Sequence, residues 1–338
     1  MATIAENIQT LRSIKSDIKN AIIQKGGSVT DAFGTYAQAI TNLPSGGGGG
    51  TEIEDALITR TISVYSNDRI SVVGDYAFYN CRLLTTINLP NCTSLRGEAL
   101  YACYSLTSVN LPLCKYLGWG AFAQCRNLLS IDLPNCIYIE NSTFYNCSAL
   151  SSVNLPLCSY IGVGAFAQCR NLLSIDLPNC SYIPTSAFQS CELLQFVNLP
   201  NCKSISVEAF SRCYKLQSIN LPNCSTIGNS AFWVCGLLSI DLPNCSYING
   251  DAFFYCSSIS IIRIPICSSI GFGAFRNCDN LKEVYLNSVT SVTSITTYTF
   301  SDCPNLTSVY VPSSLVDAFK TAEYWSSISD KIVAYTGA

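Results

Sequence analysis

Twenty cysteines recur along the chain at nearly fixed intervals, and thiols in such an array could form disulfides, bind a metal ion or act as nucleophiles. From Cys81 to Cys235 a cysteine stands at every eleventh position, and one interval of ten follows before Cys245. The chain has no histidine, which excludes Cys–His and Ser–His nucleophile pairs and the HExxH zinc motif. It also has no CxxC pair, so the usual zinc spacing is missing. We therefore expect no catalytic residue, no cofactor and no metal site, and a protein that is not an enzyme.

The geometry of stacked strands argues against disulfides between these cysteines. Neighbouring strands lie about 4.8 Å apart with parallel Cβ directions, whereas a disulfide needs Cβ atoms about 3.8 Å apart in a twisted arrangement. Cysteine otherwise behaves as a small buried hydrophobic residue. The pattern therefore predicts columns of free, buried thiols.

Two sequence contexts alternate around the cysteines, so the full repeat is 22 residues long. One context is AFxxC, as at Cys125, and the other is LPNC or LPLC, as at Cys136 and Cys114. Residues 120–136 and 164–180 are identical, which indicates recent internal duplication. A period of about 20–29 residues with Leu at set positions is typical of leucine-rich repeats.

Each repeat must supply a short strand that ends at its proline. Ile131 and Leu133 point inward while Ser130 and Asp132 point outward, and Pro134 ends the strand because it has no N–H to donate. One repeat cannot bury its own apolar face, so stacked repeats share a continuous core. We expect an α/β-type repeat solenoid of about 11 coils, with an N-terminal helical hairpin and a C-terminal cap.

A column of Asn and Asp residues follows the outward side of these strands. Its members are Asn88, Asn110, Asp132, Asn154, Asp176, Asn198, Asn220 and Asp241. Calcium needs about six to eight oxygen ligands from converging groups, and no two of these aspartates stand in neighbouring repeats. The column therefore favours a ladder of side-chain amides hydrogen-bonded along the sheet.

A second outward column, two residues after the LPNC cysteine, is rich in tyrosine. The candidate partner-binding residues are Tyr116, Tyr138, Tyr160 and Tyr182, with Trp119 three residues beyond the first. The next residue in each repeat is apolar and inward, so these rings should face solvent. Two interpretations stay open: a binding platform, because Tyr and Trp dominate interaction hot spots, and a structural ladder of packed rings.

Two apolar stripes precede the repeats. Ile4, Ile8, Leu11, Ile18 and Ile22 follow helical spacing, and a second stripe ends at residue 43. Residues 1–43 are expected to form an attachment or oligomerisation segment, because Ile-rich seams form trimers or tetramers. The Gly-rich linker 44–50 favours this over a rigid cap. The alternative is a hairpin that packs on itself or caps the repeats.

The remaining segments close the two ends of the repeat solenoid, which spans residues 76–312. Residues 51–75 alternate like strands without cysteines and are expected to form an N-terminal capping coil. Residues 313–338 should form a C-terminal cap. Around 284–300 the proline and second cysteine are lost and three residues are inserted, so that coil must be irregular.

Composition excludes several classes of partner. The net charge is -3 and only 12% of residues are charged, so no field would attract nucleic acid. No stretch reaches the roughly 18 apolar residues of a membrane helix, so no membrane insertion is expected. The start, MATIAENIQTLRSIKSD, lacks the basic segment and apolar core of a signal peptide.

The motif AFxxCxxLxxIxLP resembles the Treponema-type leucine-rich repeat of BspA-like surface proteins, over roughly residues 76–312. This resemblance implies an adhesin or host-contact protein on a bacterial cell surface. Residues 4–43 resemble short modules of phage tail and fibre proteins, and the closing segment VYVPSSLVDAFKTAEYWSSISDKIVAY resembles the ends of repeat proteins in that setting. Together the resemblances imply a phage tail- or fibre-associated receptor-binding or adhesion protein, located in the virion and assembled in the host cytoplasm.

On this interpretation residues 1–43 bind other virion proteins, and the solenoid binds a bacterial cell-surface protein or glycan. A homo-oligomer is expected from the same segment. The alternatives are a BspA-like bacterial surface adhesin, exported to the cell surface, and a self-assembling structural repeat protein without a ligand.

Overall fold

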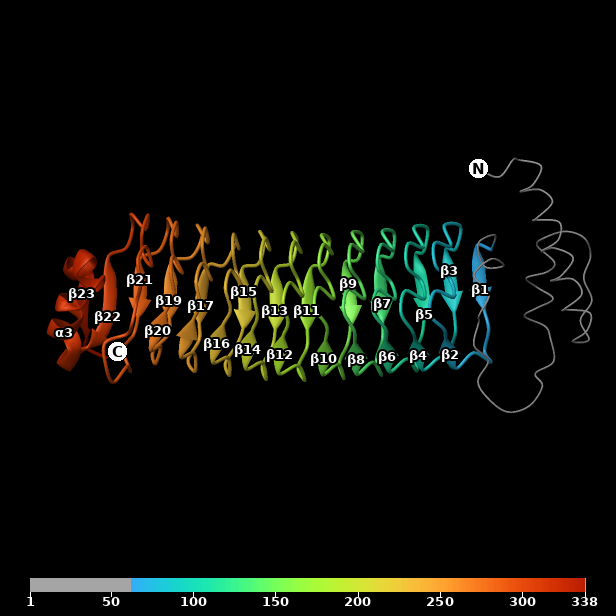
Figure 1. The fold of residues 1–338 in the computed structure, drawn as a ribbon, viewed down its shortest axis with the longest axis horizontal. Coiled ribbons are helices and arrows are strands. Elements are labelled where there is room, and N and C mark those ends of the chain that lie inside the picture. The colour runs from blue at the N-terminus through green and yellow to red at the C-terminus, as the bar shows by residue number, and fades with distance from the viewer. Residues whose placement is uncertain (1–61, 338) are drawn as a thin grey trace, which may run out of the picture.

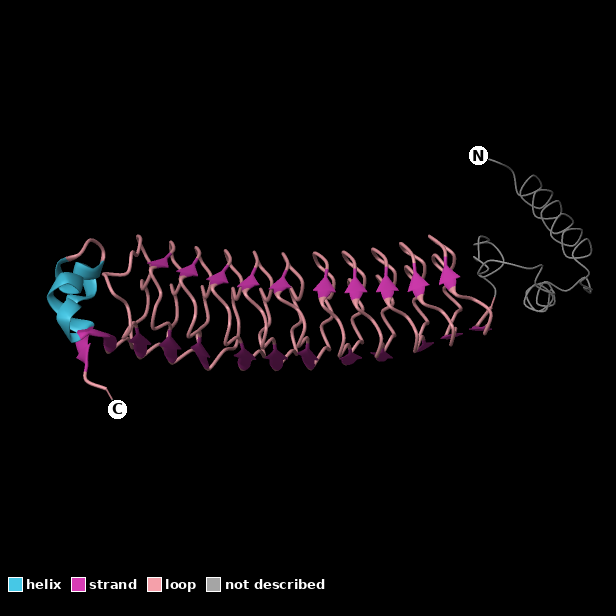
Figure 2. Ribbon diagram, turned by 90° about the horizontal axis from the view of Figure 1, so that it is seen from below, coloured by secondary structure: helices cyan, strands magenta, loops and turns pink. Residues whose placement is uncertain are grey.

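Each repeat folds into one coil with two short strands, because its apolar residues alternate with polar ones twice in 22 residues. The computed structural model describes residues 62–337, which stack into an elongated, nearly straight rod (Figure 1). Figure 2 shows the strands in two rows along this rod. The fold is a β-solenoid of about 12 coils with repeats of about 22 residues, which confirms the predicted leucine-rich-repeat solenoid.

The first face of the rod carries the strand that follows the AFxxC cysteine. Its strands are β1 (Val64–Ser66), β3 (Thr86–Asn88), β5 (Ser108–Asn110), β7 (Ser130–Asp132), β9 (Ser152–Asn154), β11 (Ser174–Asp176), β13 (Phe196–Asn198), β15 (Ser218–Asn220), β17 (Ser239–Asp241), β19 (Ile261–Arg263), β21 (Glu283–Tyr285) and β22 (Ser308–Pro312). All pairings along this face are parallel, and residues 22 apart lie side by side, except between β21 and β22, where the inserted residues make the offset 25.

The second face carries the two-residue strand that follows the LPNC cysteine. Its strands are β2 (Val72–Val73), β4 (Ser94–Leu95), β6 (Tyr116–Leu117), β8 (Tyr138–Ile139), β10 (Tyr160–Ile161), β12 (Tyr182–Ile183), β14 (Ser204–Ile205), β16 (Thr226–Ile227), β18 (Tyr247–Ile248) and β20 (Ser269–Ile270). The first residue of each strand points outward and the second is buried.

A third side, the turn face, connects each second-face strand to the next cysteine. Two residues of each coil have positive φ there, as at Gly120 (59°) and Gln124 (65°). A left-handed residue interrupts a right-handed helix, so the turn face is a run of turns. Within residues 62–337, helix is confined to the C-terminal cap.

The core is a set of columns that run the length of the rod. Phenylalanine rings stack from Phe122 to Phe300 with centroids 5.1–5.6 Å apart. All twenty cysteines are free, and all are buried except the half-buried Cys303, as predicted. Each thiol of the AFxxC column from Cys103 onward donates to a carbonyl of the preceding coil, for example Cys147 Sγ to Phe122 O at 3.1 Å. Cysteine is thus a hydrophobic residue that also satisfies an interior carbonyl.

The predicted amide ladder forms on the first face, but in segments. Asn110 Nδ2 donates to Asn88 Oδ1 (2.6 Å), and Asn154 Nδ2 donates to Asp132 Oδ1 (2.8 Å). Strand pairing stops at three boundaries, each of them a step from Asn to Asp: Asn110 to Asp132, Asn154 to Asp176, and Asn220 to Asp241. An ionised carboxylate has no N–H to donate to the preceding side chain, so each aspartate ends a ladder segment.

The second face is interrupted once, between β10 and β12. At most other boundaries the residue after the strand donates its N–H to the preceding coil, as Glu140 N does to Leu117 O (2.9 Å). Pro184 occupies that position after β12 and has no N–H to donate to Ile161 O. The boundary between the coils of Tyr160 and Tyr182 therefore lacks strand pairing on both faces, although Leu173 N still donates to Ser151 O at 3.1 Å beside the first-face strands.

The cap closes the C-terminal end of the core. It consists of η2 (Ser313–Leu315), α3 (Val316–Thr321), η3 (Trp325–Lys331) and β23 (Ile332–Tyr335), which pairs with β22. Buried Trp325 donates its indole N–H to Thr293 O at 2.7 Å and packs edge-on against Phe319. These contacts attach the cap to the last irregular coil.

Several expectations fall on residues outside the described range. The attachment segment 1–43 with Ile4, Ile8, Leu11, Ile18 and Ile22, and the linker 44–50, lie outside it. Of the expected capping coil 51–75, the described part forms β1 and β2, which pair with β3 and β4. None of the helices within 62–337 is long and apolar enough to cross a membrane.

Candidate functional site

The tyrosine column forms an exposed row on the second face. Tyr116, Tyr138 and Tyr160 begin β6, β8 and β10, and the next residue in each strand is buried. Tyr138 is 36% exposed and Tyr160 is 41% exposed. Because the strands pair in register, the backbone holds these side chains one above another.

The three rings stack face to face. The centroids of Tyr116 and Tyr138 are 5.7 Å apart at 16°, and those of Tyr138 and Tyr160 are 4.2 Å apart at 6°. Stacking covers the ring faces inside the row, so the row presents ring edges and hydroxyl groups to solvent. We call these three residues the tyrosine row.

Tyr182 is placed differently from the expected fourth member. The open boundary at Pro184 separates β12 from β10, and no ring contact joins Tyr160 and Tyr182 within the described residues. Tyr182 is 47% exposed and stands alone, with Ser204 next to it in the column. Pro184 was the sequence signal for this separation, because proline removes the donor that pairs the two strands.

Glu140 anchors one end of the row. The Tyr116 hydroxyl donates to Glu140 Oε1 at 2.6 Å, and the backbone N–H of Trp119 donates to Glu140 Oε2 at 3.1 Å. Burial, together with this acceptor carboxylate, raises the pKa of Tyr116 to about 12. Tyr116 therefore stays a protonated donor across the physiological pH range.

Trp119 does not extend the tyrosine row by stacking. Its indole, 43% exposed, meets Tyr76 edge-on at 6.0 Å, and Tyr76 in turn contacts Tyr79. A Cβ on Gly97 would collide with the indole, so that glycine makes room for it. Trp119 thus belongs to a second aromatic cluster on the turn face, which sequence reasoning missed. The tyrosines that flank the AFxxC motif in the sequence could have indicated this cluster.

The fold does not require tyrosine at the positions of the row. Ser94, Ser204, Thr226 and Ser269 occupy the same place in other coils, and their strands pair in the same way. An outward ring adds nothing to the core at these positions. The packing of the rod therefore does not need these rings, although their stacking contributes to stability locally.

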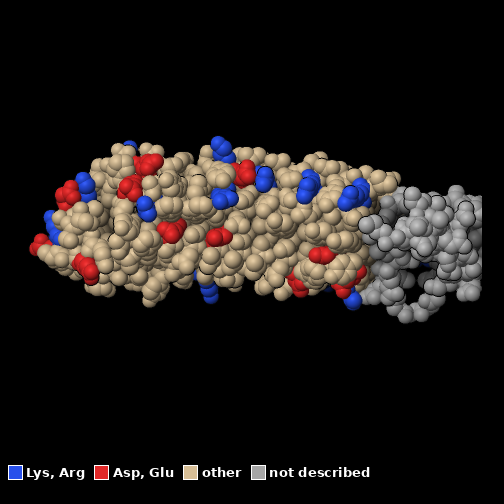
Figure 3. Space-filling model, turned by 45° about the horizontal axis from the view of Figure 1, so that its top comes forward, with Lys and Arg blue, Asp and Glu red and all other residues tan. Residues whose placement is uncertain are grey.

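Charged side chains are sparse along the rod. Figure 3 shows Lys, Arg, Asp and Glu as scattered spots on a mostly uncharged surface. Two of the arginines, Arg82 and Arg126, lie 5.3 and 5.4 Å from the ring centroid of Tyr104. No group of three or more Cys, Asp or Glu within residues 62–337 could hold a metal ion. Recognition at this surface must rest on hydroxyl groups, amides and rings.

The repeats match the family described as "BspA type Leucine rich repeat region (6 copies)" over residues 59–172, 115–239 and 225–330. A solved leucine-rich repeat protein from Bacteroides ovatus is 20% identical, with a TM-score of 0.52, covering 85% of this chain and 88% of that one. A leucine rich cell surface protein from Faecalibacterium prausnitzii is 21% identical, with a TM-score of 0.38, covering 85% and 87%. The T. pallidum protein TpLRR is 19% identical, with a TM-score of 0.38, covering 56% and 72%. No curated protein matches the chain in sequence.

Proposed function

Because the chain belongs to the BspA-type leucine-rich repeat family, we propose that it is a non-enzymatic binding protein that uses the tyrosine row to recognise a bacterial surface. The observation that carries this proposal is the placement of Tyr116, Tyr138 and Tyr160. Their rings are stacked and preorganised, with Tyr138 and Tyr160 exposed and Tyr116 half-buried, at positions where serine or threonine serves the fold equally well. Rings that the core does not need are available to a partner.

The geometry of the row indicates how a partner would be recognised. A stacked row offers a line of hydroxyl groups and ring edges held by paired strands, so little side-chain entropy is lost on binding. Tyrosine supplies apolar area and a hydrogen-bonding group together, which is why it is frequent in interaction hot spots. The partner class that fits is a bacterial cell-surface protein or glycan with few charges.

Two biological settings suit such a rod. Membership of the BspA-type family supports a bacterial surface adhesin, located on the cell surface or outside the cell, and we place this setting first. The second is a phage tail or fibre protein in the virion, supported by the likeness of residues 4–43 to phage modules and of the closing segment to the ends of repeat proteins in that setting. In that setting residues 1–43 would attach to virion proteins and form a homo-oligomer. A purely structural rod without a ligand is the remaining alternative.

The test removes two rings of the tyrosine row by substitutions that should not disrupt the fold. Tyr138→Ser and Tyr160→Ser together should reduce binding of the labelled protein to bacterial cells at least tenfold. The melting temperature should fall by only a few degrees, since a ring pair contributes about 0.5–1.5 kcal/mol.

Tyr247→Ser is the matched control, because Tyr247 lies in the same column between Thr226 and Ser269 and outside the row. It should leave cell binding intact. Unchanged binding by the double variant, with a loss of stability only, would show that the row is a structural ladder.

A further inference from the structure

The coil before the cap departs furthest from the repeat pattern among residues 76–312. Cys278 and Cys303 are 25 residues apart, and no LPNC motif stands between them. The second face ends there, since β20 continues only as an isolated bridge between Ser269 and Ser294. Much of the rod is copied sequence, so a feature tailored to one ligand is best sought where the copying stops.

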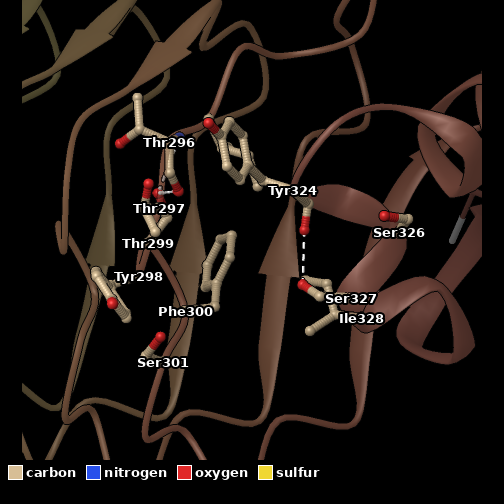
Figure 4. A pocket seen from close by; sticks show the side chains of 11 residues that line it. Thr296, Thr297, Tyr298, Thr299, Phe300, Ser301, Tyr324, Ser326, Ser327 and Ile328 are labelled. Carbon is tan, nitrogen blue, oxygen red and sulfur yellow. Dashed lines mark hydrogen bonds between the residues drawn. The ribbon is translucent and has the colours of Figure 1, made fainter.

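A hollow of about 500 Å³ lies between this coil and the cap. One wall comes from residues 295–301 and the other from Tyr324 and the start of η3 (Figure 4). Trp325 holds the two walls together, because its indole binds Thr293 O and its ring packs 5.7 Å from that of Phe300. The volume falls within the range of small-molecule sites, which is about 300–1,000 Å³.

The lining combines aromatic rings with hydroxyl groups and contains no charged side chain. Tyr298, Phe300 and Tyr324 supply the rings, and Tyr298 and Tyr324 are 52% and 41% exposed. The side-chain hydroxyls of Thr297, Ser301 and Ser326 make no hydrogen bond to another residue of the described range. They are open to an incoming ligand.

The nearest cation is already engaged. The Arg276 guanidinium lies 5.5 Å from the centroid of Tyr298, and its Nε is 3.4 Å from Asp302 Oδ2. An anionic ligand would therefore find no free positive charge in the hollow, and a cationic one would find no carboxylate in the lining. The site suits an uncharged molecule.

Tyr324 is held in an unusual backbone conformation, with φ 63° and ψ -31°. A bulky residue with positive φ costs roughly 1–3 kcal/mol and points to a functional constraint. The repeat does not impose this conformation, because Tyr324 lies in the cap. It places the ring on the wall of the hollow (Figure 4).

We propose that this hollow binds a neutral saccharide unit. The apolar face of a sugar ring packs on aromatic side chains, while its hydroxyl groups pair with hydroxyls such as those of Thr297, Ser301 and Ser326. The site lies at the C-terminal end of the rod, far along the stack from the tyrosine row, and it does not depend on the proposed role of the row.

The test uses the full chain and saturation-transfer NMR with the methyl glycosides of glucose, galactose, mannose and N-acetylglucosamine. At least one should bind the wild type. Tyr324→Gly removes the ring and tolerates the positive φ, so the melting temperature should hold or rise while the affinity falls at least tenfold.

Tyr255→Gly is the control, because Tyr255 also has positive φ (58°) and is 48% exposed, but lies outside the hollow. It should bind the glycosides like the wild type. Thr297→Val, which keeps the shape and loses the hydroxyl, should weaken binding several-fold. The proposal is overturned if none of the four glycosides binds, if Tyr324→Gly binds them as well as the wild type, or if only N-acetylneuraminic acid, run in parallel, binds.

Discussion

At the scale of single residues, each interruption of the first face coincides with a step from Asn to Asp in the outward column. Asn198 Nδ2 donates to Asp176 Oδ1 at 2.9 Å, and β11 pairs with β13. At the preceding boundary, between β9 and β11, Asp176 follows Asn154 and the two strands are not paired. Asparagine both donates and accepts, whereas aspartate only accepts, so between β1 and β17 the loss of one N–H group coincides with each loss of pairing.

Replacing Asp132 by Asn should close the boundary between β5 and β7. The new amide can donate to Asn110 while its oxygen still accepts from Asn154, so the free energy of unfolding should rise by about 0.5–1.5 kcal/mol. Hydrogen exchange should show the Leu111 amide better protected, because its counterpart Leu89 donates to Asn110 O at the paired boundary before it.

The reverse change, Asn198→Asp, serves as the control for this prediction. It removes the bond to Asp176 and should open β11 from β13, with a comparable loss of stability. If urea denaturation gives both variants the same sign of change, the amide does not control pairing.

At the scale of the elements, the thiol columns make the core sensitive to alkali. Burial raises the pKa of Cys125 and Cys169 to about 12, from an ordinary value of 9.0. Between these values the unfolded chain releases the thiol protons and the folded chain keeps them. Stability is therefore complete below pH 9 and falls as the pH rises above it.

Urea titrations between pH 8 and 10.5 should show this loss of stability. Each buried thiol contributes a slope of up to about 1.4 kcal/mol per pH unit above its ordinary pKa. The Cys125→Ala and Cys169→Ala double variant should show a shallower slope than the wild type, even though its stability at pH 7 is lower. Equal slopes in the two proteins would show that these thiols ionise in the folded state.

The columns of equivalent residues that recur in every repeat could be predicted from the sequence. The places where strand pairing or the repeat itself breaks could not. The buried thiols, the inward Ile and Leu and the outward Tyr138 follow from periodicity and from the two-residue alternation of a strand. The breaks depend on which donor faces which acceptor in the neighbouring coil, so Asp176 and Pro184 become informative only once the register is known. The hollow beside Tyr324 depends on how a cap meets an irregular coil, for which the repeat gives no template.

At the scale of the whole molecule, the rod is a one-dimensional stack in which each coil contacts only its neighbours. Its stability is then a sum over boundaries, and the boundaries are unequal. The coils of Tyr160 and Tyr182 meet at the one boundary, within the described residues, where pairing is lost on both faces. There the stack is held mainly by the turn face, as in Phe166 N–H to Ala187 O (2.8 Å), and by the stacked rings of Phe166 and Phe188. Other bonds cross it as well: Leu173 N donates to Ser151 O (3.1 Å), and Asn179 Nδ2 donates to Pro156 O (3.0 Å).

Under tension we expect this boundary to separate before any other, as a mechanical weak point of the rod. A rod that links a cell to a surface under flow is pulled along its axis, and the load passes through every boundary in series, so the weakest one yields first. In optical tweezers the first rupture should divide the rod near residue 168. Closing both faces with Asp176→Asn and Pro184→Ser, the latter copied from Ser206, should raise that rupture force, whereas Asp241→Asn, at a boundary where only the first face is open, should leave it unchanged. An adhesive rod with such a weak point would lengthen in one defined step while its two halves remain folded and attached.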